Sequence, residues 1–134
     1  MGLYQEYETD VQAENEGVYH TFKGGFKLRL ARAGGGNIAY MKALADRADQ
    51  LQNMTRQELA QSGFMAEIYA EAVVTAIEDP DGNFVDREGE AIEVGSEALV
   101  KAFRDLPEFW LECQTYATDK EYYRPLDEET TAKK

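Results

Sequence analysis

The sequence predicts a mainly α-helical protein of the α+β class, with a small N-terminal β-hairpin and about four helices. Three observations lead to this prediction. A Gly-Gly turn separates two short runs with strand character, apolar residues then recur at helical spacing, and Asn, Ser, Asp and Pro stand at the expected helix ends. The chain of 134 residues has the length of one domain. Its hydrophobic fraction of 43% is sufficient for a core.

The hairpin is expected within residues 17–32. Residues 17–22 are rich in β-forming residues, and Gly24 and Gly25 provide a turn. In the second half of the hairpin, apolar residues alternate with polar ones in the pattern of a strand with one buried face. These apolar residues are Phe26, Leu28 and Leu30.

An acidic segment precedes the hairpin and a polar segment ends the chain. Residues 1–16 carry five acidic and no basic side chains, which indicates a flexible acidic arm. Four apolar residues of this arm are available for pairing during assembly, namely Leu3, Tyr4, Tyr7 and Val11. Residues 17–124 form the predicted single helical domain with its N-terminal hairpin, and residues 125–134 form a polar tail.

Two helices are predicted after the glycine run 34–36. Asn37 caps the first, whose apolar face comprises Ile38, Met41, Leu44, Ala45, Ala48 and Leu51. Thr55 and Glu58 form a capping box for the second. Its apolar stripe comprises Met65, Ile68, Tyr69, Ala72, Val73, Ala76 and Ile77. Gly63 weakens this helix by about 1 kcal/mol relative to Ala, or marks a bend in it.

Two further helices are predicted after a turn at residues 79–83. Residues 84–94 are expected to form a second short hairpin or an extended loop. Ser96 caps the third helix, and Pro107 suits the first turn of the fourth. Their apolar residues are Leu99, Ala102, Phe103 and Leu106 in the third helix, and Phe109, Trp110, Cys113, Tyr116 and Ala117 in the fourth.

Charge and composition exclude several functional classes. The formal net charge of −12 disfavours contact with nucleic acid, because a phosphate backbone would be repelled. A single histidine, His20, and a single cysteine, Cys113, exclude an internal disulfide and the usual zinc sites. The sequence contains no run of about 18 apolar residues, so no membrane span is predicted. The start of the chain lacks the pattern of a secretion signal, so a cytoplasmic protein is expected.

No catalytic, cofactor or metal site is predicted. The glycine run 34–36 lacks the remaining residues of a phosphate-binding loop, so we interpret it as a hinge. Calcium-loop spacing is present at Asp79, Asp81, Asn83 and Glu90, but Phe84 occupies the position that requires glycine. The carboxylates of Glu67, Glu71 and Glu78 lack histidine partners and indicate a solvated face. His20 has no evident catalytic partner, and Cys113 lies on an apolar stripe.

A protein-binding surface is predicted instead. Tyr122, Tyr123 and Arg124 lie at the end of the last helix, and Tyr and Arg are favoured at interfaces. We expect the surface to come from this aromatic end or from the apolar stripe of the second helix. The predicted protein-binding residues are Met65, Tyr69, Phe109, Trp110, Tyr122, Tyr123 and Arg124.

Several segments resemble tail assembly chaperones of long-tailed, siphovirus-like bacteriophages. The resemblance extends over residues 22–124 and is carried by segments 26–33, 37–44, 69–74, 96–109 and 117–124. The chain has Ile77-Glu78-Asp79 where the family often has a Trp, and its glycine run before Asn37 is long.

The resemblance implies a protein that is not an enzyme and needs no cofactor, acting in the host bacterial cytoplasm. Such chaperones bind the tape measure protein, keep it soluble and promote assembly of the tail tube. The implied partners are the tape measure protein, the tail tube protein and a frameshifted longer form of the chain itself, and a homo-oligomer is left open. The alternatives are a structural virion protein of the tail or neck, which joins its neighbours through the acidic arm and hairpin, and a metal-dependent enzyme.

Overall fold

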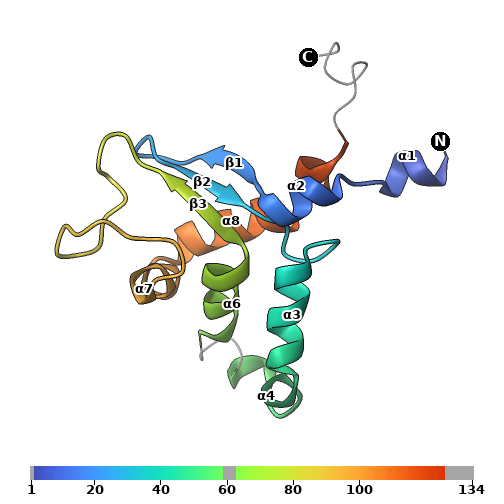
Figure 1. Ribbon diagram of the computed structural model, residues 1–134. Helices are drawn as coiled ribbons and strands as arrows, with labels where there is room; N and C mark the ends of the chain where they lie inside the picture. The colour runs from blue at the N-terminus through green and yellow to red at the C-terminus, as the bar shows by residue number, and fades with distance from the viewer. Residues whose placement is uncertain (1, 59–62, 126–134) are drawn as a thin grey trace.

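The computed structural model describes residues 2–58 and 63–125 (Figure 1). A three-stranded antiparallel sheet, in the order β1-β2-β3, is formed by β1 (Val18–Thr21), β2 (Lys27–Leu30) and β3 (Val74–Glu78). The α-helices are α1 (Leu3–Tyr7), α2 (Val11–Glu16), α3 (Ile38–Asp46), α4 (Ala48–Gln52), α6 (Phe64–Ala72), α7 (Glu97–Asp105) and α8 (Pro107–Thr118). A 3₁₀ helix, η1 (Lys120–Tyr123), follows α8.

The predicted α+β class is confirmed, but its detail is not. The described residues contain seven α-helices and three strands, where the sequence predicted about four helices and a two-stranded hairpin. The hairpin itself is present, with Val18 paired to Leu30 and Thr21 to Lys27. Gly24 and Gly25 make its turn with positive φ angles of 100° and 85°, which glycine adopts without steric cost.

The third strand replaces the end of the predicted second helix. The apolar stripe was expected to continue in a helix to Ile77, but α6 ends at Ala72 and the chain enters β3. Val73, Val74, Thr75 and Ile77 are β-branched, which favours an extended backbone. β3 pairs antiparallel with β2, so Ile77 stands opposite Leu28 in the sheet and is not part of a helix.

The apolar face predicted for the first helix is confirmed only in part. Leu44 and Leu51 pack against the core, but the segment forms two helices, α3 and α4, and Met41 is 52% exposed. Ile38 is 73% exposed, whereas Tyr40 and Ala43 are buried. The side chain of Asn37 is fully buried, donates to the carbonyls of Arg32 and Ala72, and accepts from the amide of Tyr40. These bonds fix the rotation of α3, so that Tyr40 faces the Tyr69 ring of α6.

The predicted acidic arm divides into two parts in the structure. α1 extends away from the rest of the chain, and its end lies at the side opposite to α7 (Figure 1). α2 instead packs against the body, because the carboxylate of Glu14 is buried and pairs with Arg32. Lys120 donates to the carbonyl of Glu6 and also lies over the Tyr7 ring, which connects α1 to η1.

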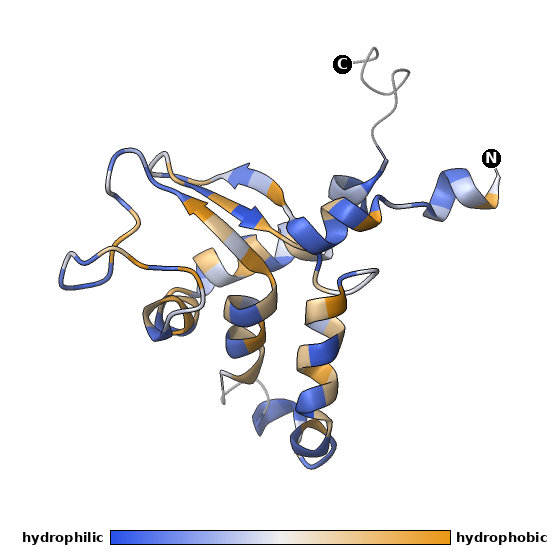
Figure 2. Cartoon of the chain, in the orientation of Figure 1, coloured by the Kyte–Doolittle hydropathy of each residue, from blue (hydrophilic) through white to orange (hydrophobic). Residues whose placement is uncertain are grey.

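The core lies where the sheet, α6, α7 and α8 meet. Figure 2 shows hydrophobic residues on the strands and on α6. The largest fully buried apolar side chains are Leu28, Leu30, Ile68, Val73, Val74, Leu99, Phe103, Tyr69 and Tyr123. Ser96 caps α7 by accepting from the amide of Leu99, and Pro107 occupies the start of α8, as predicted. Within the described ranges, no helix has the length and apolar character needed to cross a bilayer.

Candidate protein-binding groove

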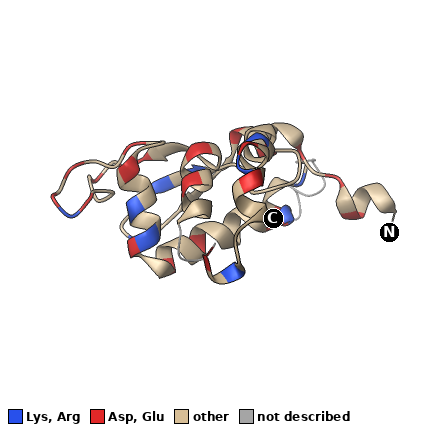
Figure 3. Cartoon of the chain, turned by 90° about the horizontal axis from the view of Figure 1, so that it is seen from below, with Lys and Arg blue, Asp and Glu red and all other residues tan. Residues whose placement is uncertain are grey.

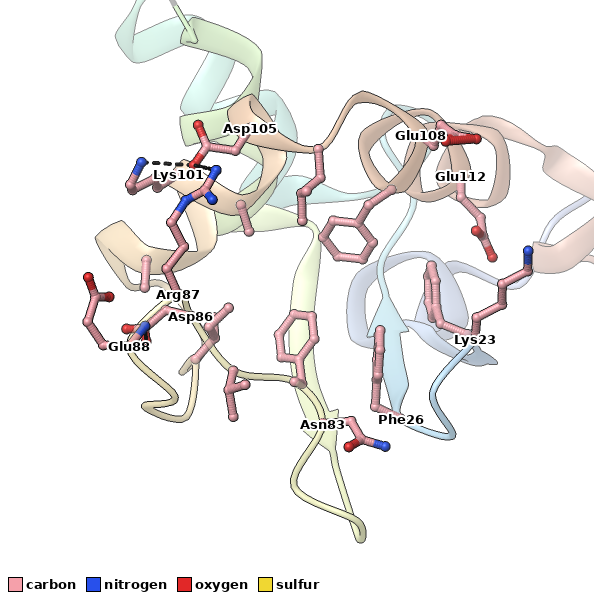
Figure 4. Close-up of a pocket in the computed structure, with 18 residues that line it drawn as sticks. Lys23, Phe26, Asn83, Asp86, Arg87, Glu88, Lys101, Asp105, Glu108 and Glu112 are labelled. Atoms are coloured by element: carbon pink, nitrogen blue, oxygen red, sulfur yellow. Dashed lines mark hydrogen bonds and ion pairs between the residues drawn. The ribbon is translucent and has the colours of Figure 1, made fainter.

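An apolar groove of about 600 Å³ opens between α7, the start of α8, the hairpin turn and the loop that joins β3 to α7 (Figure 4). Four phenylalanine rings line it, from Phe22, Phe26, Phe84 and Phe109. The aliphatic lining comes from Val85, Ile92, Ala98, Ala102 and Leu106. We call this feature the aromatic groove.

The hairpin turn places the first two rings side by side. Phe22 follows β1 and Phe26 precedes β2, and the amide of Phe22 donates to the carbonyl of Phe26 at 2.9 Å. Their ring centroids lie 5.5 Å apart in a stacked arrangement. Because the turn between them is closed by backbone hydrogen bonds, the two rings form a fixed part of the groove wall.

The turn after β3 brings the third ring to the same place. The carboxylate of Asp79 accepts from the amides of Asn83 and Phe84, and the amide side chain of Asn83 donates to the carbonyl of Gly24. Phe84 then lies 4.7 Å from Phe26 and 5.9 Å from Phe109, measured between ring centroids. Asp79 and Asn83, which have calcium-loop spacing, therefore serve this turn.

The groove combines a buried floor with an exposed apolar edge. Phe22 and Phe84 are buried, and Phe26 and Phe109 are partly exposed. At the edge, Val85 and Leu106 are exposed. A concave apolar surface with a preformed aromatic floor is typical of a binding site, because little ordering is needed when a ligand enters it.

Acidic side chains dominate the charges around the groove. The five acidic lining residues are Asp86, Glu88, Asp105, Glu108 and Glu112, and the three basic ones are Lys23, Arg87 and Lys101. This lining therefore has a net charge of −2 at neutral pH. In the view from below, acidic residues occur along the chain from the loop before α7 to α1 (Figure 3).

Two of the three basic residues are paired with one carboxylate. Lys101 lies 2.8 Å from Asp105, and Arg87 lies 3.7 Å from the same oxygen. The hydrogen bond from Lys101 is the main reason that the pKa of Asp105 lies below its usual value. Glu108 and Glu112 stand on α8, across the opening from Asp86 and Glu88 (Figure 4).

The structure separates the predicted protein-binding residues. Phe109 lines the aromatic groove, whereas Met65 and Trp110 border a second, more polar depression beside α6 and α7. Tyr69 and Tyr123 are buried in the core, so their side chains are not available to a partner in this state. Tyr122 and Arg124 lie beyond the other end of α8, where Arg124 pairs with Glu121.

Tyr123 has a structural contact that predicts its effect on stability. Its hydroxyl donates to the carbonyl of Leu30 at 2.9 Å, and burial raises the pKa of this tyrosine. Tyr123→Phe is therefore expected to lower the free energy of unfolding by about 1 kcal/mol, since one buried hydrogen bond is lost. Urea titration followed by Trp110 fluorescence measures this change. Tyr122→Phe is the control, because Tyr122 is exposed, and an equal loss in both variants would contradict the assignment.

His20 is buried against two tyrosine rings and gives a pH-dependent prediction. Its ring stacks on Tyr116 at 4.1 Å and meets Tyr122 edge-on, and among the described residues its Nε2 has no hydrogen-bond partner. Burial lowers the pKa of His20 below 6.5. As the pH falls below about 6.5, the unfolded chain binds a proton that the folded chain resists, so stability is complete above this pH and declines below it.

The expected decline is at most about 1.4 kcal/mol per pH unit. Urea titrations at pH 7.5 and 5.5 would measure it. His20→Phe keeps the ring stacking without a titrating group, so its loss of stability over this interval is expected to be smaller than that of the unmodified chain. Equal losses in both proteins would contradict a role for His20 in the pH dependence.

Other polar groups singled out in the sequence have structural contacts. Glu71 pairs with Arg47, and the backbone amide of Glu90 donates to the carboxylate of Asp86. Cys113 is fully buried and burial raises its pKa, which disfavours a reactive thiolate. In the two described ranges, no three His, Cys, Asp or Glu side chains are gathered as a metal site would require.

Sequence reasoning missed three of the four rings in the aromatic groove. Phe22, Phe26 and Phe84 lie beside glycine-containing turns, where they were considered only as strand or loop residues. The available signal was an aromatic residue on each side of the Gly24–Gly25 turn. Their convergence with Phe109 depends on tertiary contacts between segments that are far apart in the chain.

Comparison with known proteins identifies no family for this chain. No protein-family model, no curated protein and no solved structure matches the chain. The sequence motifs, the groove and its charges are therefore the basis for assigning a function.

Proposed function

We propose that this chain is a tail assembly chaperone of a long-tailed bacteriophage. It is a non-enzymatic protein of the host bacterial cytoplasm that binds the tape measure protein, keeps it soluble and promotes assembly of the tail tube. The observation that carries the proposal is the open aromatic groove, which offers an apolar surface on a strongly acidic protein. The resemblance of segments within residues 22–124 to this family supports the choice of partner.

The groove suits the apolar side chains of a partner helix. Helix-in-groove binding places residues at i, i+3, i+4 and i+7 into an apolar groove. A volume of about 600 Å³ accommodates several large side chains but not a complete helix. The net charge of −12 would then keep the complex soluble while the apolar face of the partner is covered.

Co-expression with the tape measure protein of the same phage tests the proposal. We expect the tape measure protein to move from the pellet to the soluble fraction and to co-purify with this chain. Ala98→Leu with Ala102→Leu fills the groove from α7 and is expected to abolish this effect. Ala39→Leu with Ala45→Leu adds the same volume at exposed positions of α3 and serves as the control. Unchanged solubilisation by the folded groove-filled variant would contradict the proposal.

A second candidate function is a structural protein of the tail or neck. The observation that favours it is the exposed apolar surface at the N-terminal end, where Leu3, Tyr4, Tyr7 and Val11 are 57% to 75% exposed. Such residues would join neighbouring subunits in a particle. Mass spectrometry of purified virions separates the two functions, because the chaperone is expected to be absent from the finished particle.

The proposed chaperone has further partners. By the same resemblance, it contacts the tail tube protein and a frameshifted longer form of itself. Pull-down with each of these proteins, in the presence and absence of the tape measure protein, measures whether they join one complex.

A further inference from the structure

We infer that the aromatic groove selects a basic amphipathic helix, with apolar residues on one face and Lys or Arg on both sides of that face. This inference rests on the proposed function, since it names the chemistry of the segment that the groove binds. It goes further because it predicts a charge preference, which apolar burial alone would not produce.

The two edges of the groove carry the argument. Glu108 and Glu112 stand on α8 at one edge, and Asp86 and Glu88 stand on the opposite loop (Figure 4). A helix lying over the groove, with its apolar side chains inserted, would therefore have carboxylates on both sides of its apolar face. Lys or Arg beside the apolar residues would complement both edges, whereas Glu or Asp there would be repelled.

The basic residues of the lining do not cancel the negative charge of these carboxylates. Lys101 and Arg87 both pair with Asp105, so their charges are directed to a carboxylate of the groove itself. Lys23 is the remaining basic residue of the lining, and Figure 4 shows it on the same side of the opening as Glu112. The lining remains net acidic, and the whole chain adds attraction for a basic partner.

The same charges disfavour a second copy of this chain as the occupant. The exposed apolar helix α1 could supply side chains for the groove of a neighbour, but it brings Glu6 and Glu8 with it and carries no basic residue. Two copies would also approach with a net charge of −12 each. Like charges at such an interface reduce its affinity.

Two synthetic helical peptides test the charge preference on the full chain. Both carry Leu at i, i+3, i+4 and i+7, and they differ only in having Lys or Glu beside the Leu face. Fluorescence anisotropy of the labelled peptides gives their dissociation constants. We expect the Lys peptide to bind at least about tenfold more tightly at low salt, and the difference to shrink at high salt as the charges are screened.

Charge-reversal variants locate the preference. Glu88→Lys with Glu112→Lys changes one carboxylate at each edge and is expected to remove the tenfold preference. Glu6→Lys with Glu8→Lys makes the same change in net charge at α1, away from the groove, and is expected to leave the preference in place. The control matters because total charge alone would affect both variants equally.

The outcomes separate failure of this inference from failure of the proposed function. Equal binding of the two peptides, weak binding of both, or an equal effect of both variant pairs would overturn the charge preference. The proposed function would still stand if the tape measure protein were solubilised and the groove-filled variant lost this activity. A dimer in sedimentation experiments that dissociates on filling the groove would overturn the inference in favour of a second copy.

Discussion

Arg32→Met is expected to lower the free energy of unfolding by about 3–5 kcal/mol. The side chain of Glu14 is only 1% exposed, and Arg32 supplies the cation that pairs with it. Removing the guanidinium leaves a buried carboxylate without its counter-charge, which costs much more than the loss of a surface ion pair. The carboxylate of Glu14 is tightly packed against the glycine run: a Cβ atom at Gly36 would lie 2.7 Å from Oε1 of Glu14.

Arg29→Met is the matched control for this prediction. Arg29 pairs with Glu16 at 3.3 Å, but both side chains are substantially exposed, at 34% and 48%. The loss expected there is below about 1 kcal/mol, because water solvates both charges when the pair is broken. Urea titrations of the two variants under the same conditions make the comparison. Similar losses in both would argue that burial of Glu14 does not govern the stability of this contact.

Leu99→Ala is the second substitution with a large expected effect, about 2–5 kcal/mol. Leu99 lies on α7, is fully buried and belongs to the core where α6, α7 and α8 meet. Truncation removes buried methyl groups and leaves a cavity that the neighbouring rings fill only in part. The expected result is a lower midpoint in urea with the slope of the transition unchanged.

Leu111→Ala is the control for Leu99→Ala, because it makes the same substitution at an exposed position. Leu111 lies on α8 and is 64% exposed, so the same chemical change is expected to alter stability by no more than about 0.5 kcal/mol. If Leu111→Ala destabilised the chain as much as Leu99→Ala does, the exposed face of α8 would have to be covered in solution.

Local signals in the sequence predicted the parts of the fold that local contacts determine. The side chain of Ser96 accepts from an amide three residues later, and the glycine turn joins two adjacent strands. Both contacts lie within one element or one hairpin, so residue type and spacing are sufficient to predict them. The capping box of Thr55 and Glu58 forms for the same reason.

Long-range contacts determined the parts that were missed. Strand β3 has apolar residues that fit either a helix or a strand, and pairing with β2 decides between them. The rotation of α3 follows from the bond between Asn37 and the carbonyl of Ala72, 35 residues away. For the same reason, sequence pattern did not distinguish the buried Tyr123 from the exposed Tyr122.

The position of η1 has a consequence for the order of events during synthesis. Tyr123 contacts Leu30 through its hydroxyl, and its backbone carbonyl accepts from the amide of Asp10 at the start of α2. A nascent chain therefore lacks these contacts until η1 has emerged from the ribosome. The N-terminal half of the chain can therefore complete its packing only after η1 has been synthesised.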